Sequence, residues 1–191
     1  MCKSDLRQQL ITIRQDYVKS LEFAWHEGRE WPADLQSLLT AARCVGGYIA
    51  VRSEANLTSL LRDVAALGTP IALPFLATRE AAMEFRHYEK DGVLGKAPFG
   101  FRQPSQSAAI AHPDVILTPL LGFDRAGNRL GQGGGHYDRF FEAFPQALRI
   151  GVAWSVEEVS AIAVDPWDVS LDAVITEKEW IIPSNSRIAP K

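Results

Sequence analysis

Short apolar runs alternate along this chain with segments in which apolar residues recur every three or four positions. The apolar runs predict strands that are buried on both faces, at residues 47–53, 70–76, 83–88, 113–121, 148–154 and 172–176. The periodic segments predict helices at residues 4–27, from 32 onward, and at 56–68, 136–144 and 156–162. Strands and helices that alternate in this way predict an α/β fold, with a mostly parallel sheet and helices on both of its faces.

Turn and capping residues predict where several of these elements end. Ser4 is expected to cap the first helix, and Gly28 is expected to stop it. Pro32 suits the first turn of the second helix, and Gly68 suits the end of the third. Residues 91–112 are rich in Gly, Pro, Ser and Gln, which predicts a long loop. The length of 191 residues predicts one domain, spanning 1–191.

Composition narrows the classes of partner. The net charge is −3, so no overall basic field favours nucleic acid. No apolar run approaches the roughly 20 residues that a membrane helix needs, and the N-terminus has no apolar signal segment. Two cysteines, Cys2 and Cys44, are too few for a disulfide framework, and no histidine or cysteine spacing suggests zinc. We therefore expect a cytoplasmic protein, a monomer, that acts on small molecules.

The most unusual segment is GFDRAGNRLGQGGGHYDRFF, residues 122–141, which contains six glycines. It follows the apolar run 113–121 and precedes a predicted helix. Ligands of open α/β sheets bind beyond the carboxyl ends of the strands, and a helix N-terminus with free glycine N–H groups favours an anion, most often phosphate. The Walker and dinucleotide-binding patterns do not fit, because His136 and Tyr137 stand where those motifs need other residues. The alternative is a flexible hairpin turn.

Side chains beside the glycines favour a ligand site. Arg129 has the fork geometry that suits phosphate, and Asp138 is a suitable ligand for Mg²⁺. His136 and Tyr137 can stack on or hydrogen-bond a flat heterocycle. Each also has a simpler explanation: Asp138 could satisfy the N–H groups at a helix start, and His136 could be an ordinary surface histidine.

The pattern FDxxGxRLGxGGGxYDR, from Phe123 to Arg139, resembles the signature of the 5-formyltetrahydrofolate cyclo-ligase family, also called methenyltetrahydrofolate synthetase. The motif is long and specific. The resemblance covers roughly Lys3 to Ile182. Further pieces in the order of the family are Lys3-x-x-Leu6-Arg7, Glu54, Pro70 to Pro74, Met83-x-Phe85, and Asp168 with Asp172.

The resemblance implies a fold of the ribose-phosphate isomerase and CoA-transferase type and an ATP- and Mg²⁺-dependent ligase. Its substrate would be a reduced folate, 5-formyltetrahydrofolate, and its products 5,10-methenyltetrahydrofolate, ADP and phosphate. In the implied mechanism the formyl oxygen attacks the γ-phosphate, and N10 then displaces the phosphate. Such chemistry depends on positioning, charge neutralisation and exclusion of water more than on acids and bases.

The same resemblance assigns roles to individual residues. It gives Arg129 and Tyr137 catalytic roles, and it gives Asp138 and Asp168 to Mg²⁺. It implies that the nucleotide is bound by Lys3, Arg7, Arg129, Leu130, Gly131, Gln132, Gly133, Gly134, Gly135, His136 and Tyr137. It implies that the folate is bound by Ile49, Glu54, Met83, Gln132, Gly133, Gly134, Gly135 and His136.

From the residues alone, simpler interpretations stand beside these roles. Lys3 and Arg7, one helical turn apart, could form a solvated basic helix end. Glu54 could be an acid at a helix start, and Asp168 in DPWDVS could be a turn residue. Ile49 and Met83 could be plain core residues, in addition to any contact with the folate.

Two positions depart from the pattern of the family, which usually has Glu at 103 and Tyr or Phe at 136. Gln103 loses a charge, and His136 adds a group that titrates near neutral pH. Three alternatives stay open: a non-catalytic nucleotide or folate binder on the same fold, an ATP-dependent cyclising enzyme with another substrate, and a sugar-phosphate isomerase or CoA transferase. The last needs a carboxylate in the active-site loop, and only Glu54 has an arguable placement.

Overall fold

The structure is a computed structural model that describes residues 2–22, 25, 30–89, 92–98 and 100–188. Within them, an eight-stranded sheet has the order β12-β11-β10-β7-β1-β2-β3-β6. Its strands are β1 (Val45–Gly46), β2 (Ile71–Phe75), β3 (Glu84–Tyr88), β6 (Ile110–Ala111), β7 (Val115–Pro119), β10 (Leu148–Val152), β11 (Ala173–Ile175) and β12 (Trp180–Ile181). The five adjacent strands from β11 to β2 are parallel, and β3, β6 and β12 are antiparallel at the two edges. A mixed α/β fold with a mostly parallel central sheet is thus confirmed.

Helices cover both faces of this sheet, because the strands are apolar on both sides. The helices are α1 (Lys3–Ser20), α2 (Ala33–Ala41), α3 (Thr58–Ala66) and α4 (His136–Ala143). Ile71 and Leu73 of β2 pack in one core cluster with α2 and α3. Ala72, between them, packs with Phe140 and Phe141 of α4. Successive residues of a strand face opposite ways, so one apolar strand supports both layers.

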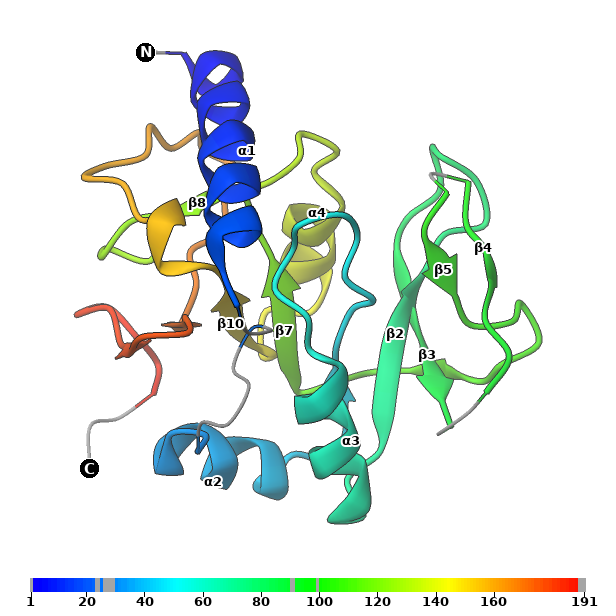
Figure 1. The fold of residues 1–191 in the computed structure, drawn as a ribbon. Coiled ribbons are helices and arrows are strands. Elements are labelled where there is room, and N and C mark those ends of the chain that lie inside the picture. The colour runs from blue at the N-terminus through cyan, green and yellow to red at the C-terminus, as the bar shows by residue number, and fades with distance from the viewer. Residues whose placement is uncertain (1, 23–24, 26–29, 90–91, 99, 189–191) are drawn as a thin grey trace.

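Two short hairpins lie outside the main sheet. The strands β4 (Gly95–Lys96) and β5 (Arg102–Gln103) pair beyond β2 and β3, on the side away from α1 (Figure 1). The strands β8 (Gly122–Phe123) and β9 (Arg129–Leu130) pair directly after β7. The predicted loop at 91–112 therefore contains β4, β5 and β6. The glycine-rich segment contains the β8–β9 hairpin followed by a glycine loop, so a hairpin is present, and the ligand role of the loop stays a prediction.

The strands expected at 70–76, 83–88, 113–121, 148–154 and 172–176 are confirmed as β2, β3, β7, β10 and β11. The strand expected at 47–53 is wrong, because β1 ends at Gly46. The Gly47 N–H still donates to the Ala72 carbonyl at 2.8 Å, but the Tyr48 hydroxyl then donates to the Ala55 carbonyl at 2.7 Å. This bond holds residues 48–55 as a loop. The strand expected to be last, at 172–176, is followed by β12.

The first helix is shorter than predicted. It ends at Ser20, and Leu21 is already extended; Gly28 lies outside the described residues. The buried indole of Trp25 donates to the Ala153 carbonyl at 3.1 Å, which takes the chain out of the helix and into the core. The N-cap is Cys2, whose side chain accepts from the Asp5 N–H, so Ser4 lies inside the helix.

The remaining helix predictions have mixed outcomes. The helices at 56–68 and 136–144 are confirmed as α3 and α4, and α2 begins just after Pro32. Gly68 adopts a left-handed φ of 89° after α3, as a helix stop should. The helix expected at 156–162 is wrong beyond one 3₁₀ turn, η1 (Ser155–Glu157). The chain then runs beside β8, where the Val159 N–H donates to the Phe123 carbonyl at 2.9 Å.

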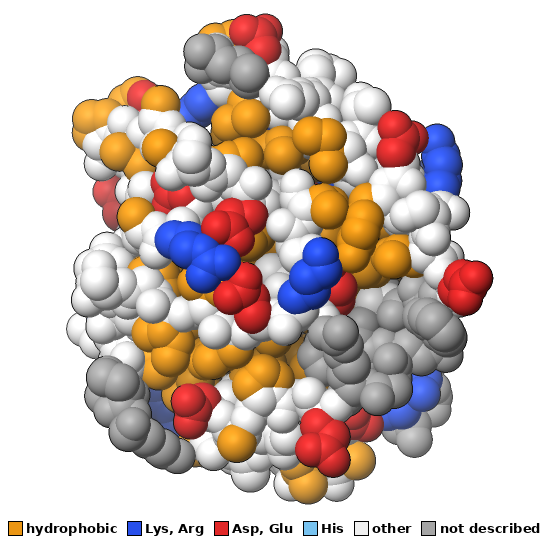
Figure 2. Space-filling view, turned by 60° about the vertical axis from the view of Figure 1, so that its left-hand side comes forward, with side chains coloured by type: hydrophobic (Ala, Val, Ile, Leu, Met, Phe, Trp, Pro, Cys, Tyr) orange, Lys and Arg blue, Asp and Glu red, His pale blue; other side chains and the backbone are white. Residues whose placement is uncertain are grey.

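Charges of both signs lie next to each other on the surface in Figure 2. An example in the structure is Arg125, which pairs with Glu158 and Glu179 at 2.7 Å each. In the described part of the chain, no helix has both the length and the apolar character needed to cross a membrane.

Candidate functional site

The carboxyl ends of β1, β2 and β7 meet at a cavity of about 660 Å³. The loop after β1 supplies residues 48, 49, 51, 52 and 54, and the end of β7 supplies Pro119. The glycine loop supplies Gln132 and Gly134, and the start of α4 supplies His136 and Tyr137. The segment wrongly expected to be a strand therefore forms one wall of the cavity. The cavity lies at the carboxyl ends of the parallel strands, which is where open α/β sheets bind their ligands.

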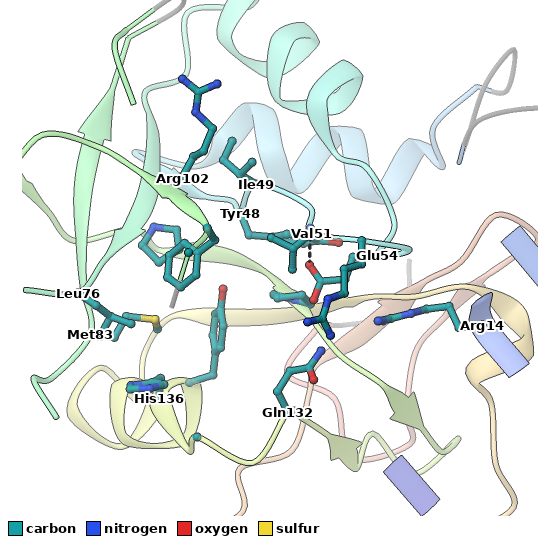
Figure 3. Close-up of a pocket in the computed structure, with 17 residues that line it drawn as sticks. Arg14, Tyr48, Ile49, Val51, Glu54, Leu76, Met83, Arg102, Gln132 and His136 are labelled. Carbon is teal, nitrogen blue, oxygen red and sulfur yellow. Dashed lines mark hydrogen bonds between the residues drawn. The ribbon is translucent and has the colours of Figure 1, made fainter. Parts of the chain in front are cut away.

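Glu54 is the acidic residue among the described cavity walls (Figure 3). Its carboxylate accepts from the Val51 N–H at 3.0 Å, and the second oxygen has no further bond of this kind to the backbone among the described residues. Burial raises the pKa of Glu54, while Arg14, Arg52 and a hydrogen bond with Gln132 act against that rise. A half-buried carboxylate held by the Val51 N–H and by Gln132 can still accept N–H groups of a flat ring, because each of its oxygens has two lone pairs.

Apolar and phenolic side chains form the rest of the wall. Ile49 and Met83 both line the cavity, so contact with a folate stays a prediction for each, and Met83 is also part of a core cluster with α4. Tyr137 also lines the cavity. Burial raises the pKa of its hydroxyl, and the charge of Glu54 raises it further. Its hydroxyl is therefore protonated at neutral pH and available as a hydrogen-bond donor.

The glycine loop is held by arginines bound to its carbonyl groups. Arg7 donates to the Gly131 carbonyl at 2.8 Å, and Arg139 donates to the Gly134 carbonyl at 3.0 Å. Gly133 and Gly135 have left-handed φ values of 100° and 63°, which side chains rarely adopt. With carbonyl groups engaged by arginine, the loop leaves backbone N–H groups as its donors toward a ligand.

Leu130 contributes only its backbone to such a site, because its side chain is 1% exposed and packs against Leu10 and Ile162. His136 lines the cavity, with its Nδ1 3.2 Å from the guanidinium of Arg139. Burial lowers the pKa of His136, and the charge of Arg139 lowers it further. The imidazole is thus neutral at neutral pH, which suits stacking more than proton transfer.

Arg129 is buried beneath the loop and does not belong to the cavity wall. It donates to Asp138 at 2.5 Å and to the Val169 carbonyl, and its guanidinium lies 5.1 Å from the centre of the Phe141 ring. Burial lowers the pKa of Arg129, while the charges of Asp138 and Asp168 act in the opposite direction. The structure therefore brings both carboxylates of the expected metal pair around this one guanidinium.

Lys3 and Asp168 also meet. The ammonium group lies 2.6 Å from Asp168 and 2.6 Å from Asp165. Burial opposes the charge of Lys3, but the bonds to these two carboxylates outweigh it and raise its pKa. Burial likewise opposes ionisation of Asp168, and the Asp165 N–H and Lys3 outweigh it and lower the pKa.

The carboxylates near Arg129, Asp138 and Asp168, are the residues that were expected to hold Mg²⁺. Among residues 2–188 as described, no group of three or more His, Cys, Asp and Glu side chains is arranged to hold a metal ion. Mg²⁺ is usually held by one or two carboxylates together with substrate phosphates. The pair Asp138 and Asp168 fits a Mg²⁺ ion that arrives with a nucleotide, and does not fit a cage built by the protein alone.

Arg14 is a cavity residue that the sequence analysis missed. Its side chain is buried, and it donates to Ser53 Oγ at 3.0 Å, the Leu120 carbonyl at 3.2 Å and Glu157 at 3.1 Å. Burial raises the pKa of Glu157, and Arg14 counters that rise. The network joins α1 to the residue before Glu54. The signal in the sequence was spacing, because Arg14 follows Arg7 by seven positions and so shares its helix face.

Gln103 lies outside the cavity wall. Its amide oxygen accepts from the Leu76 N–H at 2.9 Å, and its amide nitrogen donates to the Leu76 carbonyl at 3.2 Å. It is 7% exposed, and it fastens β5 to the residue after β2. An ionised glutamate could not make the second of these bonds.

Comparison with known proteins identifies the family. The model of the 5-formyltetrahydrofolate cyclo-ligase family matches residues 1–177. The chain is 34% identical over 191 residues to the 5-formyltetrahydrofolate cyclo-ligase of Mycolicibacterium smegmatis, covering 94% of this chain and 96% of that protein. It is 29% identical over 147 residues to the enzyme of the same name from Escherichia coli, covering 73% and 81%.

The fold is similar to the NMR structure of Aquifex aeolicus 5,10-methenyltetrahydrofolate synthetase. The TM-score is 0.71 at 23% identity, and the match covers 100% of this chain and 97% of that one.

Proposed function

The chain belongs to the 5-formyltetrahydrofolate cyclo-ligase family, and we propose that its cavity binds the folate while its glycine loop binds the phosphates of ATP. The activity is the ATP-dependent conversion of 5-formyltetrahydrofolate to 5,10-methenyltetrahydrofolate. One observation carries the assignment of the two sites: Gln132, Gly134, His136 and Tyr137 belong both to the glycine segment and to the cavity wall. Reactants held in these two places meet at that shared edge.

The pterin ring is assigned to the end of the cavity at Glu54. Its carboxylate has an oxygen free of the Val51 bond and can accept from the N–H groups of the pterin. Ile49 and Met83 would contact the faces of the ring, and burying such apolar area contributes about 25 cal/mol per Å². His136, neutral because of its lowered pKa, would contact the folate or the nucleotide by stacking.

The phosphates are assigned to the backbone of Gly131, Gln132, Gly133, Gly134 and Gly135 and to the N-terminus of α4. Arg7 already touches this loop, and Lys3 lies on the same helix face one turn earlier. Arg129 supplies a buried positive charge beneath the loop. Such charge is worth more in a site from which water is excluded than in solution.

Mg²⁺ is assigned to Asp138 and Asp168, with the phosphates of ATP completing its coordination. When bound, the ion would neutralise charge that builds up on the phosphates. Both carboxylates now pair with cations, Arg129 and Lys3. Binding would therefore exchange one set of charge partners for another, so the site is kept electrostatically balanced before the nucleotide arrives.

The reaction then follows in two steps. The formyl oxygen attacks the γ-phosphorus, a P–O bond forms, and the bond to ADP breaks. N10 attacks the formyl carbon and loses its proton, and the C–O bond breaks to release phosphate. We assign Tyr137, whose pKa is raised further by burial, to donate a hydrogen bond to the formyl oxygen, and the cavity would shield the phosphorylated intermediate from water.

Three finer features belong to the same proposal. We expect a fold relationship to ribose-phosphate isomerases and CoA transferases, supported by the parallel sheet with helices on both faces. We expect a reducing cytoplasm as the compartment, supported by the two free thiols Cys2 and Cys44. We expect a monomer, which light scattering on the purified protein would test.

The experiment is direct. Purified protein is mixed with 5-formyltetrahydrofolate, Mg²⁺ and ATP, and the near-ultraviolet absorbance of the methenyl product is followed. The proposal expects a rise that needs all three additions. If the protein binds ATP and gives no rise, it is a binder or an enzyme with another substrate. A full rise without Mg²⁺ would overturn the metal assignment alone.

A further inference from the structure

Arg14 is a buried cation that reaches the cavity from α1. Its side chain is 4% exposed, and its guanidinium group points toward the part of the wall that carries Glu54 (Figure 3). Burying a charge costs free energy that its surroundings must offset, and an apolar side chain of similar volume would avoid that cost. A cation kept at this position therefore indicates a role beyond packing.

Two side chains hold Ser53, the residue before Glu54. Arg14 Nε donates to the Ser53 hydroxyl oxygen at 3.0 Å, and the indole of Trp154 donates to the Ser53 carbonyl at 2.9 Å. Arg14 and Trp154 are joined by Glu157, which accepts from the guanidinium at 3.1 Å and from the Trp154 N–H at 2.8 Å. Both the side chain and the backbone of Ser53 are thus fixed to one buried network.

The backbone of this loop is strained directly before Ser53. Arg52 has a left-handed φ of 55°, and among the described residues it is the one residue other than glycine with a positive φ. Such a conformation is costly for a long side chain, and it persists only where neighbouring contacts hold it in place. The bonds to Ser53 follow the strained residue, and the Val51 N–H bond to Glu54 spans it. These contacts therefore stabilise the backbone that presents Glu54 to the cavity.

The charge of Arg14 also acts on Glu54. Burial raises the pKa of Glu54, while the hydrogen bond from the Val51 N–H and the charge of Arg14 lower it. The other charged or titratable groups that face Glu54 are Arg52 and Tyr48 on its own loop, Tyr137 on α4 and Glu157 on η1. An ionised carboxylate is the form that accepts N–H groups of a pterin, so Arg14 favours the form that binds.

The same face of α1 also touches the glycine loop. Arg7 lies seven positions before Arg14 and donates to the Gly131 carbonyl at 2.8 Å, whereas Arg14 donates to the Leu120 carbonyl at 3.2 Å. The helix thus holds both ends of the segment between these two carbonyl groups. A single rigid element therefore sets the distance between the proposed phosphate loop and the carboxylate of Glu54.

We propose that Arg14, held by Glu157, is a positioning residue that acts through Glu54 and fixes its carboxylate in the orientation that meets the pterin. The inference rests on the proposed function, because the pterin is assigned to Glu54. The positive charge of Arg14 additionally favours the ionised carboxylate. Loss of Arg14 should therefore weaken folate binding and leave ATP binding unchanged.

A double-mutant cycle on folate binding tests this role. Arg14→Met removes the cation and keeps apolar volume, and it should raise the KM for 5-formyltetrahydrofolate about tenfold, with the KM for ATP unchanged. In the background of Glu54→Gln, the same change should raise the folate KM by less than about twofold, because the group through which Arg14 acts is gone.

The dependence on pH gives a readout that a merely structural role would not move. On acidification, folate binding to Arg14→Met should weaken at a higher pH than in the wild type, because Glu54 has lost a neighbouring cation. Arg14→Lys restores the charge without the fork that binds Ser53. It should return this pH toward that of the wild type and recover only part of the folate KM.

Two further variants keep the test decisive if Arg14→Met does not fold with the charge of Glu157 left unpaired. Arg14→Met together with Glu157→Gln removes both buried charges. Ser53→Ala removes only the hydroxyl that Arg14 binds, and it should raise the folate KM about threefold. Each of these effects should again disappear in the background of Glu54→Gln.

Arg62→Ala is the matched control, since Arg62 is an exposed arginine of α3 outside the cavity wall. It should leave both KM values and the pH dependence as in the wild type. If the effect of Arg14→Met is equal in the two backgrounds, or if the KM for ATP rises by the same factor, the positioning role is wrong and the proposed function stands.

Direct titration with 5-formyltetrahydrofolate, without ATP, gives the same cycle as Kd values. If the wild type binds this folate without converting it, these Kd values decide the positioning role. If the wild type neither binds nor converts it, the proposed function fails, and the role of Arg14 fails with it.

Discussion

Replacing Asp138 by alanine should lower stability as well as activity. Its carboxylate lies 2.5 Å from Arg129, and the two side chains are 24% and 5% exposed. Removing one partner of a buried ion pair leaves the other charge buried without compensation, at a cost of about 3–5 kcal/mol. Because Asp138 is partly exposed and Arg129 keeps its bond to the Val169 carbonyl, we expect the lower end, about 3 kcal/mol.

This loss should be visible by heat and by urea. For a chain of this length, 1 kcal/mol lowers Tm by about 2–4 °C, so Asp138→Ala should unfold roughly 6–12 °C earlier. In urea, the midpoint should fall while the slope stays the same, which identifies a change of stability. Asp16→Ala is the control, because the side chain of Asp16 is 69% exposed and its pair with Lys19 is a surface pair. It should change stability by less than about 0.5 kcal/mol.

A double-mutant cycle tests the reasoning behind the number. Arg129→Met removes the buried charge and keeps apolar volume, so the double variant with Asp138→Ala should be more stable than Asp138→Ala alone. A loss below about 1 kcal/mol in Asp138→Ala, or strictly additive effects in the double variant, would refute the account of a buried, coupled pair. Asp138→Asn keeps an acceptor for Arg129. Because the amide is neutral, this variant should still lose stability, but less than Asp138→Ala, while losing turnover as fully; activity lost out of proportion to stability separates the proposed Mg²⁺ role from the structural one.

Three shorter predictions follow from neighbouring contacts. Lys3→Ala removes the partly exposed ion pair with Asp168, so it should cost less than about 1 kcal/mol of stability. It should nevertheless raise the KM for ATP. An unchanged KM would show that Lys3 does not belong to the nucleotide site. Burial raises the pKa of Glu54, so on acidification folate binding should weaken at a higher pH than for an ordinary glutamate. Glu54→Gln should abolish this dependence on pH. If folate affinity depends on pH equally in the wild type and in Glu54→Gln, the prediction is contradicted. Gln103→Glu loses the donor to the Leu76 carbonyl and buries a carboxylate, so the pKa of that carboxyl should be raised in the folded state. The loss of stability, about 1–3 kcal/mol, should therefore be absent near pH 4 and grow as the pH rises. Unfolding midpoints that do not depend on pH would disprove this.

Much of the fold could be predicted because its signals are local. The runs that became β2, β7 and β10 are short, apolar and bounded by turn residues, so neighbouring residues alone mark them as buried strands. The helix α4 follows from its apolar spacing after a glycine loop. The failures have tertiary causes. The first helix ends at Ser20, ahead of the Trp25 indole that donates to the Ala153 carbonyl in the core, and the loop after β1 is closed by the Tyr48 hydroxyl.

The glycine segment also carried most of the information about function. Its motif is long enough to indicate the family, and it contains Arg129, Tyr137 and Asp138, with Arg129 and Asp138 nine positions apart. The walls of the cavity were harder to foresee. Arg14 looks like one more basic residue of a helix until Glu157, 143 positions away, is packed against it.

The sequence by itself therefore determined the longer strands β2, β3, β7, β10 and β11, the glycine loop and the family, because backbone preferences and apolar periodicity are properties of adjacent residues. Only the tertiary structure decided which charges meet: Lys3 with Asp168, and Arg129 with Asp138. Charge partners are chosen by distance in space and by the water that packing removes from between them. Both quantities are set by how the sheet brings distant segments together, and neither is written in the order of neighbouring residues.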